Sequence, residues 1–300
     1  MKKNINLGLI GFSEGNGHPY SWSAIFNGYD KVKMKSSGYP AISNYLKKQT
    51  FPDAQIKGGK VTHIWTQDLN LSKHIASAAL IENIVDDYHD LIQQVDAVLL
   101  ARDDAENHLE FAESFLKAGI PIYIDKPLAL TVSDAKKIIN LQCYEGQLFS
   151  CSAMKYSSEL KLSDKQKNIV GEIRSIHGYV QKSWDKYAVH IIEPVLQLIP
   201  NRGELVNSKI QRSSDNVLLI VNFQSGIDIH LQSSGKPTIP ISLHIIGTKG
   251  KVTLIFKDTF GAFHSTLKNF MEGIINKDIR TPSEDMIEVV RLVELGRKNK

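Results

Sequence analysis

Short apolar runs alternate with helix-like segments through the first half of the chain. The runs lie at residues 5–12, 61–66, 84–85, 96–100, 120–124 and 147–153. Most of them are followed by apolar positions at helical spacing. A parallel sheet whose strands are joined by helices produces this alternation. We therefore predict a doubly wound α/β domain with a parallel sheet over residues 1–154.

The second half changes to a period of two. Ile229 and Leu231 alternate with polar neighbours, and the same alternation returns near residues 241–245 and 252–256. This pattern is typical of an antiparallel sheet with one packed face and one polar face. It predicts a second, α+β domain over residues 155–300. We expect the polar face to be solvated. The alternatives are that it forms one wall of a substrate-binding site or an interface between subunits.

One connection in the first half is unusually long. About thirty residues, 27–60, stand where a short link between a helix and the next strand normally suffices. We interpret this segment as an insertion and a candidate lid.

Composition excludes several classes of protein. Hydrophobic residues make up 42% and charged residues 23% of the 300, unlike a disordered chain. The net charge of +4 comes from scattered basic residues, so we expect no nucleic-acid partner. Cys143 and Cys151 are too few for a disulfide scaffold and lack metal-ligand spacing. No apolar stretch approaches the roughly 20 residues of a membrane span. We predict a cytoplasmic protein without a metal site or a membrane partner.

A glycine-rich turn follows the first predicted strand. Such turns bind pyrophosphate because phosphate can then reach backbone N–H groups and the positive end of the next helix. The spacing here, Gly-x-x-x-Gly-x-Gly, departs from the usual fingerprint. A turn that binds no phosphate is therefore the alternative, and Glu14 would repel an anion unless it points away. The candidate cofactor-binding residues of this turn are Gly11, Phe12, Ser13, Gly15, Gly17 and His18.

Two other strand ends carry candidate residues. Asp68 follows the second main strand, where an acidic residue accepts hydrogen bonds from ribose hydroxyls in dinucleotide-binding folds; a helix-flanking aspartate is the alternative. Asp125, Lys126 and Pro127 follow the strand at 120–124, at the sheet edge where open α/β proteins bind ligands. Lys126 is thus a candidate for proton exchange, with a surface loop residue as the alternative.

Titratable residues gather at the start of an apolar helix in the second half. Asp185, Lys186 and Tyr187 lie close before His190. Histidine is the side chain best suited to proton transfer at neutral pH, although a lone one at a helix start more often packs or caps. The cluster favours an acid–base role for His190.

Two longer segments identify a family. Val95–Ala101, His108 and the run 118–129, which contains Asp-Lys-Pro, resemble the glucose-fructose oxidoreductase / inositol dehydrogenase / rhizopine-catabolism (Gfo/Idh/MocA) family. The later order, with the His190 helix and Gly247-Thr248-Lys249-Gly250 before a strand, agrees with it. The resemblance implies a Rossmann domain followed by a domain with a large open, mainly antiparallel sheet, which often mediates homodimers or homotetramers.

The resemblance also implies an activity and a site. The family transfers a hydride between NAD or NADP and a hydroxyl or keto carbon of a sugar, cyclitol or related polyol. Lys126 would contact the nicotinamide ribose and substrate, and its bond to Pro127 is expected to be cis. His190 would be the acid–base residue, assisted by Lys126, Tyr187 and Asp185. The other cofactor-binding positions that it implies are Ala101, Arg102, His108 and Asp125.

Several positions depart from the family pattern. The glycine fingerprint is altered, Arg102-Asp103 replaces Thr-Pro, and Lys186 stands where an aspartate is expected four residues before His190. Glu193 supplies an acidic group three residues after it. These departures keep two alternatives open. One is a non-catalytic protein of this fold that senses a sugar or dinucleotide, and the other is a redox-neutral, NAD-using glycosidase-like enzyme.

Overall fold

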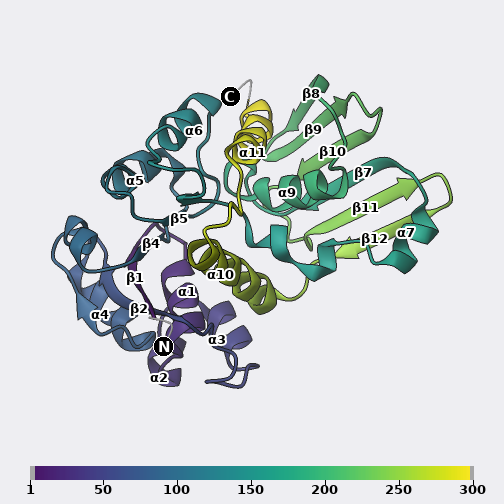
Figure 1. The fold of residues 1–300 in the computed structure, drawn as a ribbon. Coiled ribbons are helices and arrows are strands. Elements are labelled where there is room, and N and C mark those ends of the chain that lie inside the picture. The colour runs from purple at the N-terminus through teal and green to yellow at the C-terminus, as the bar shows by residue number, and fades with distance from the viewer. Residues whose placement is uncertain (1–3, 298–300) are drawn as a thin grey trace. The chain divides into compact units, whose positions relative to one another are not determined.

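The computed structural model describes residues 4–297, which form two compact units. The first unit comprises residues up to 129, 133–150 and 263–284, and the second comprises 130–132, 151–262 and the residues from 285 onward. Figure 1 labels their helices and strands. The predicted division at residue 154 placed the segment 263–284 in the second domain, whereas the structure places it in the first unit. It packs in the first unit, where the Phe270 ring lies 5.8 Å from the Tyr123 ring.

The first unit contains a six-stranded parallel sheet with the strand order β3-β2-β1-β4-β5-β6. This order is that of a Rossmann fold, whose ligand crevice lies where the order reverses between β1 and β4. The strands are β1 (Ile5–Ile10), β2 (Gly59–Trp65), β3 (Asn83–Ile84), β4 (Ala97–Leu100), β5 (Ile122–Ile124) and β6 (Leu148–Phe149).

Helices cover this sheet. Helices α1 and α4 contact β2 and each other, whereas α5 contacts β4 and β5. All four residues of β4 are buried, as expected for a central parallel strand. The helical elements are α1 (His18–Asn27), α2 (Lys31–Lys35), α3 (Pro40–Leu46), α4 (Leu69–Ala78), η1 (Tyr88–Gln93), η2 (Ala105–Asn107), α5 (His108–Lys117) and α6 (Val132–Ile139).

The predicted insertion, residues 27–60, is part of the core of the first unit. It contains α2 and α3, and it buries apolar side chains in both helices and in the loop that follows. Those side chains are Met34, Ile42, Leu46 and Ile56, each at most 7% exposed. Burial of this kind stabilises the segment in place, which does not suit the lid that the sequence suggested.

The second unit is built on a mixed six-stranded sheet with the order β12-β11-β7-β10-β9-β8. Every neighbouring pair is antiparallel except β7 with β10. Helix α9 packs on β7 and β11. The strands are β7 (Ile173–Val180), β8 (Leu205–Ser213), β9 (Asn216–Phe223), β10 (Asp228–Ser233), β11 (Ser242–Gly247) and β12 (Lys251–Ile255).

The predicted fold class is confirmed in both units. Ile229 and Leu231 are buried while His230 between them is not, which is the alternation that the sequence showed. The remaining helical elements are η3 (Ala153–Tyr156), η4 (Ser158–Leu160), α7 (Asp164–Val170), α8 (Trp184–Tyr187), α9 (Val189–Leu198), α10 (Thr259–Asn276) and α11 (Ser283–Leu295). None of the helices in residues 4–297 is long and apolar enough to span a bilayer.

Candidate functional site

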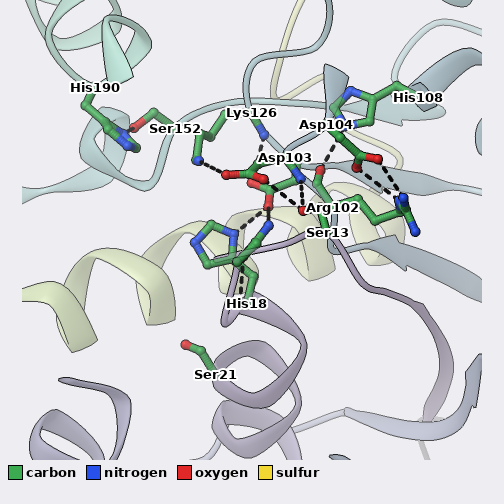
Figure 2. Close-up of polar contacts among 12 residues, drawn as sticks. Ser13, His18, Ser21, Arg102, Asp103, Asp104, His108, Lys126, Ser152 and His190 are labelled. Atoms are coloured by element: carbon green, nitrogen blue, oxygen red, sulfur yellow. Dashed lines mark hydrogen bonds and ion pairs between the residues drawn. The ribbon is translucent and has the colours of Figure 1, made fainter. Parts of the chain in front are cut away.

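Three loops of the first unit begin at the carboxyl ends of neighbouring parallel strands. The loop after β1 starts at Gly11, the loop after β4 at Ala101 and the loop after β5 at Asp125. Parallel strands place these ends at one edge of the sheet, so residues far apart in sequence meet there. Figure 2 shows Ser13, His18, Asp103 and Lys126 gathered at this edge.

Asp125 is the buried centre of this edge. Its Oδ2 accepts a hydrogen bond from Asn16 Nδ2 at 2.9 Å and lies 2.5 Å from His18 Nδ1, while its Oδ1 accepts from the Lys126 backbone N–H at 2.7 Å. Burial alone would raise the pKa of Asp125. The charges of His18 and Lys126, with the hydrogen bonds from His18 and Asn16, outweigh that effect and hold the pKa below its ordinary value. The carboxyl is therefore an ionised anchor for the turn after β1.

Asp103 ties a second set of side chains together. Ser13 Oγ donates to Asp103 Oδ1 at 2.8 Å, and the Asp103 backbone N–H donates back to Ser13 Oγ at 3.0 Å. Lys126 Nζ lies 3.5 Å from Asp103 Oδ2, and both side chains are about one-tenth exposed or less. The predicted cis bond between Lys126 and Pro127 is present. The aspartate that departs from the family pattern thus contacts the lysine that the family pattern singles out.

Arg102 and Gln67 occupy the rim beside the glycine turn. The Arg102 guanidinium donates to both carboxylate oxygens of Asp104 and lies 4.4 Å above the Phe111 ring. Burial would raise the pKa of Asp104, but the hydrogen bonds and charge of Arg102 and the bond from Asn107 lower it. Gln67 accepts from the Phe12 N–H and donates to the Phe12 carbonyl. The Phe12 backbone is therefore engaged by a side chain that sequence reasoning missed.

The glycine turn is open at one point and covered at another. A Cβ atom added to Gly17 would lie 2.5 Å from Ile42 and 2.9 Å from Tyr39, so the inserted segment packs directly on this glycine. Gly15 has a φ of +79° and nothing within 4 Å of an added Cβ. Glu14 and Gly15 are exposed residues, and within the described residues their backbone N–H groups donate no hydrogen bond. The open part of the turn is therefore at Glu14–Gly15, and Gly17 is needed for packing.

Three other predicted cofactor-binding residues have structural partners. The Asp68 carboxylate accepts from the N–H groups of Asn70 and Leu71 and so caps α4, the alternative that the sequence left open. Fully buried His108 bridges the Leu128 and Arg102 carbonyls through its two ring nitrogens. Ala101 N–H bonds the Ile10 carbonyl and extends the sheet. Their contacts with a cofactor remain predictions.

The second unit holds His190 in a buried polar cluster. Its Nδ1 lies 2.6 Å from Ser152 Oγ, and the Ser152 backbone N–H donates to Glu193 Oε2 at 2.7 Å. His190 is 8% exposed, Glu193 6% and Ser152 0%. Burial raises the pKa of Glu193 to about 8, although Lys155 and the bond from Ser152 act in the opposite direction. Ser152 therefore links the predicted acid–base residue to a carboxyl that is mostly protonated at neutral pH.

Tyr187 and Asp185 have different partners in the structure. The Tyr187 ring lies edge-on to His190 at 5.3 Å, and Lys182 Nζ donates to the Tyr187 hydroxyl at 2.5 Å. Asp185 Oδ1 is 3.4 Å from Arg297 Nε. The structure thus groups Tyr187 with His190 and pairs Asp185 with an arginine of the carboxyl-terminal end. Among residues 4–297, no three His, Cys, Asp or Glu side chains are arranged to hold a metal ion.

Part of the chain is similar to a known protein family. Residues 36–151 match the family model for Gfo/Idh/MocA oxidoreductases, described as an oxidoreductase family with an NAD-binding Rossmann fold. Inositol 2-dehydrogenase from Serratia proteamaculans is 29% identical over 79 residues, which are 26% of this chain and 23% of that protein. The chain therefore aligns with about a quarter of the length of this curated relative.

Solved structures share the whole fold. A probable dehydrogenase from Thermotoga maritima superposes with a TM-score of 0.74 at 15% identity, covering 98% of both chains. Scyllo-inositol dehydrogenase from Lactobacillus casei, solved with bound NAD(H) and scyllo-inositol, superposes with a TM-score of 0.71 at 15% identity, covering 99% of this chain and 96% of that one. Identities this low establish the fold alone, and the similarity to the family model is confined to residues 36–151. Residues 36–151 are therefore similar to the Gfo/Idh/MocA oxidoreductases, a family with an NAD-binding Rossmann fold.

Proposed function

We propose that this protein is an NAD(P)-dependent oxidoreductase that acts on a hydroxyl or keto carbon of a cyclitol, sugar or sugar derivative. The observation that carries the proposal is Lys126 at the carboxyl end of β5, whose ammonium lies 3.5 Å from Asp103 Oδ2 and whose backbone N–H donates to the Asp125 carboxylate. The inositol dehydrogenases among the similar proteins suggest a cyclitol as the first substrate class to test.

The cofactor, when bound, supplies the acceptor or donor of the hydride. The backbone N–H groups of Glu14 and Gly15, with the Ser13 turn, would hold its phosphates, and Asp68 remains the candidate for the adenosine ribose. Lys126 binds and orients the substrate hydroxyl, because its ammonium is fixed by Asp103. His190 exchanges the hydroxyl proton, with its Nδ1 held by Ser152 and with Tyr187 at its edge. A placed acid–base group contributes about 10² to 10⁴ in rate.

The test measures turnover of a panel of cyclitols, polyols and keto sugars by the purified protein with oxidised or reduced NAD or NADP. The absorbance of the nicotinamide reports the reaction. We expect turnover in the wild type, a loss of about 100-fold or more in Lys126→Ala and His190→Ala, and unchanged cofactor affinity in His190→Ala. Lys137→Ala is the matched control, since Lys137 is an exposed lysine paired with Asp134 on α6. Cofactor binding without turnover across the panel would instead support a sensor.

We further propose that the protein is a homodimer or homotetramer. The face of the second sheet that carries His230 also exposes Ile246 and Ile255, by 45% and 40% of their surface. Apolar side chains on an open sheet face favour association with another chain. Light scattering of the purified protein measures the mass, and a monomer at micromolar concentration would contradict this proposal.

A further inference from the structure

His18 and Asp125, two of the predicted cofactor-binding residues, form a histidine–aspartate pair at the carboxyl edge of the first sheet. His18 Nδ1 is 2.5 Å from Asp125 Oδ2, and the His18 backbone N–H donates to Asn16 Oδ1 at 2.8 Å. Asn16 Nδ2 donates to the same Asp125 oxygen at 2.9 Å. The side chain of Asp125 is 1% exposed and that of His18 is 17% exposed. The aspartate is therefore enclosed, while part of the imidazole reaches the surface of the unit.

Aromatic rings fix the orientation of His18. Its ring stacks on Trp22 with 5.1 Å between centroids and 13° between planes, and Trp22 stacks on Tyr123 at 4.5 Å and 13°. Phe263 meets His18 edge-on at 5.0 Å. A stack of three rings that ends on a core strand leaves the imidazole little rotational freedom. Such fixed side chains are what proton transfer at a defined atom requires.

The pairing determines which ring nitrogen carries the proton. An ionised carboxylate only accepts hydrogen bonds, so His18 Nδ1 must be the donor and carry hydrogen. Nε2 of the neutral ring then holds a lone pair and can accept a proton. The imidazolium that forms is stabilised by the carboxylate, which is the logic of a histidine–aspartate pair in acid–base catalysis. His190 Nδ1, by contrast, contacts the uncharged hydroxyl of Ser152.

We propose that His18 is a second residue able to act as the acid–base group of the proposed dehydrogenase, as the alternative to His190 for the one hydroxyl proton, with Asp125 as its positioning residue. In the oxidation direction, Nε2 would take that single proton in place of His190, while the hydride on the same carbon would go to the bound cofactor and a carbonyl would form. The location supports this role, because the Lys126 backbone N–H donates to the same Asp125 carboxylate and Figure 2 shows His18 and Lys126 at one sheet edge. This inference rests on the proposed function.

The experiment compares His18→Gln and Asp125→Asn with the wild type. We expect kcat to fall by about 100-fold or more in His18→Gln, with the Kd of the cofactor unchanged in calorimetric titration. Nitrogen NMR of the imidazoles in the cofactor-free protein gives a second readout. His18 should be the Nδ1–H tautomer in the wild type and shift toward the Nε2–H tautomer in Asp125→Asn, because an amide can donate to Nδ1.

His89→Gln and Asp87→Asn are matched controls. His89 Nδ1 lies 2.8 Å from Asp87 Oδ1, but both side chains are more than half exposed. These variants should retain wild-type kcat. If the wild type turns over substrate, two results with His18→Gln overturn the inference. One is an unchanged kcat. The other is a loss of cofactor affinity with an unchanged kcat, which would make His18 a phosphate ligand. A wild-type His18 in the Nε2–H tautomer also overturns it. Absence of turnover in the wild type would instead refute the proposed function on which it rests.

Discussion

The Glu193→Gln substitution removes one titratable group from the interior of the second unit. Glu193 is 6% exposed, and its Oε2 accepts the Ser152 N–H at 2.7 Å. Glutamine has the same shape and keeps an oxygen for that hydrogen bond, so the change isolates the effect of ionisation. The prediction concerns the pH dependence of folding stability.

Its sign follows from the direction of the pKa shift. Burial raises the pKa of Glu193 from 4.5 to about 8, so between these values the folded protein keeps the proton and the unfolded chain releases it. Unfolding therefore releases a proton, and stability falls as pH rises through this window. Above the folded pKa both states are ionised and the slope disappears. At about 1.36 kcal/mol per pH unit, the loss between pH 6 and pH 9 is about 3 kcal/mol.

Chemical unfolding of wild type and Glu193→Gln at pH 6, 7, 8 and 9 measures this effect. Other groups titrate in both proteins, so the quantity of interest is the difference between the two unfolding free energies. We expect Glu193→Gln to gain about 3 kcal/mol on the wild type across the range. A difference that stays constant within about 0.5 kcal/mol would show that the carboxyl is ionised in the folded protein, and the reasoning would be refuted.

Substitutions at three further positions test other parts of the structure. Gly17→Ala should destabilise the first unit by about 1–3 kcal/mol in urea unfolding, because the new Cβ meets Ile42 and Tyr39, and an unchanged stability would contradict that packing. Asp68→Ala should lower the free energy of unfolding by about 1 kcal/mol because the α4 cap is lost, whereas Asp68→Asn should lower it little. Both variants should bind NAD more weakly. If both keep the wild-type affinity for NAD, Asp68 is not part of the cofactor site. Tyr187→Phe removes the hydroxyl that Lys182 contacts, so we expect kcat to fall by about tenfold or more while the Kd of the cofactor stays unchanged. A variant that keeps the wild-type kcat would limit the role of Tyr187 to packing.

Local pattern identified the elements and the strand ends that carry Asp125 and Lys126. The helix capped by Asp68 and the alternation around Ile229 are also local properties, since a cap or a period of two depends on residues close in sequence. The same is true of the run 118–129, whose residues sufficed to indicate the family. Those predictions required no knowledge of which distant segments meet.

The partners of the site residues depended on tertiary structure. Asp125 is 107 residues from His18, Ser152 is 38 residues from His190, and Ser13 is 90 residues from Asp103. No periodicity along the chain reports such pairings, because they arise when separate strands end at one edge or separate elements share a core. The insertion gives the same lesson: its apolar residues were visible, but only the folded chain shows that Ile42 and Tyr39 cover Gly17. The sequence by itself therefore determined the alternating strands and helices of the first sheet and the period-two strands of the second half, but not the helices of the segment 27–60 or the strands β8 and β9. The tertiary structure decided which polar side chains are brought out of water and into contact, and long-range burial sets their charge and orientation.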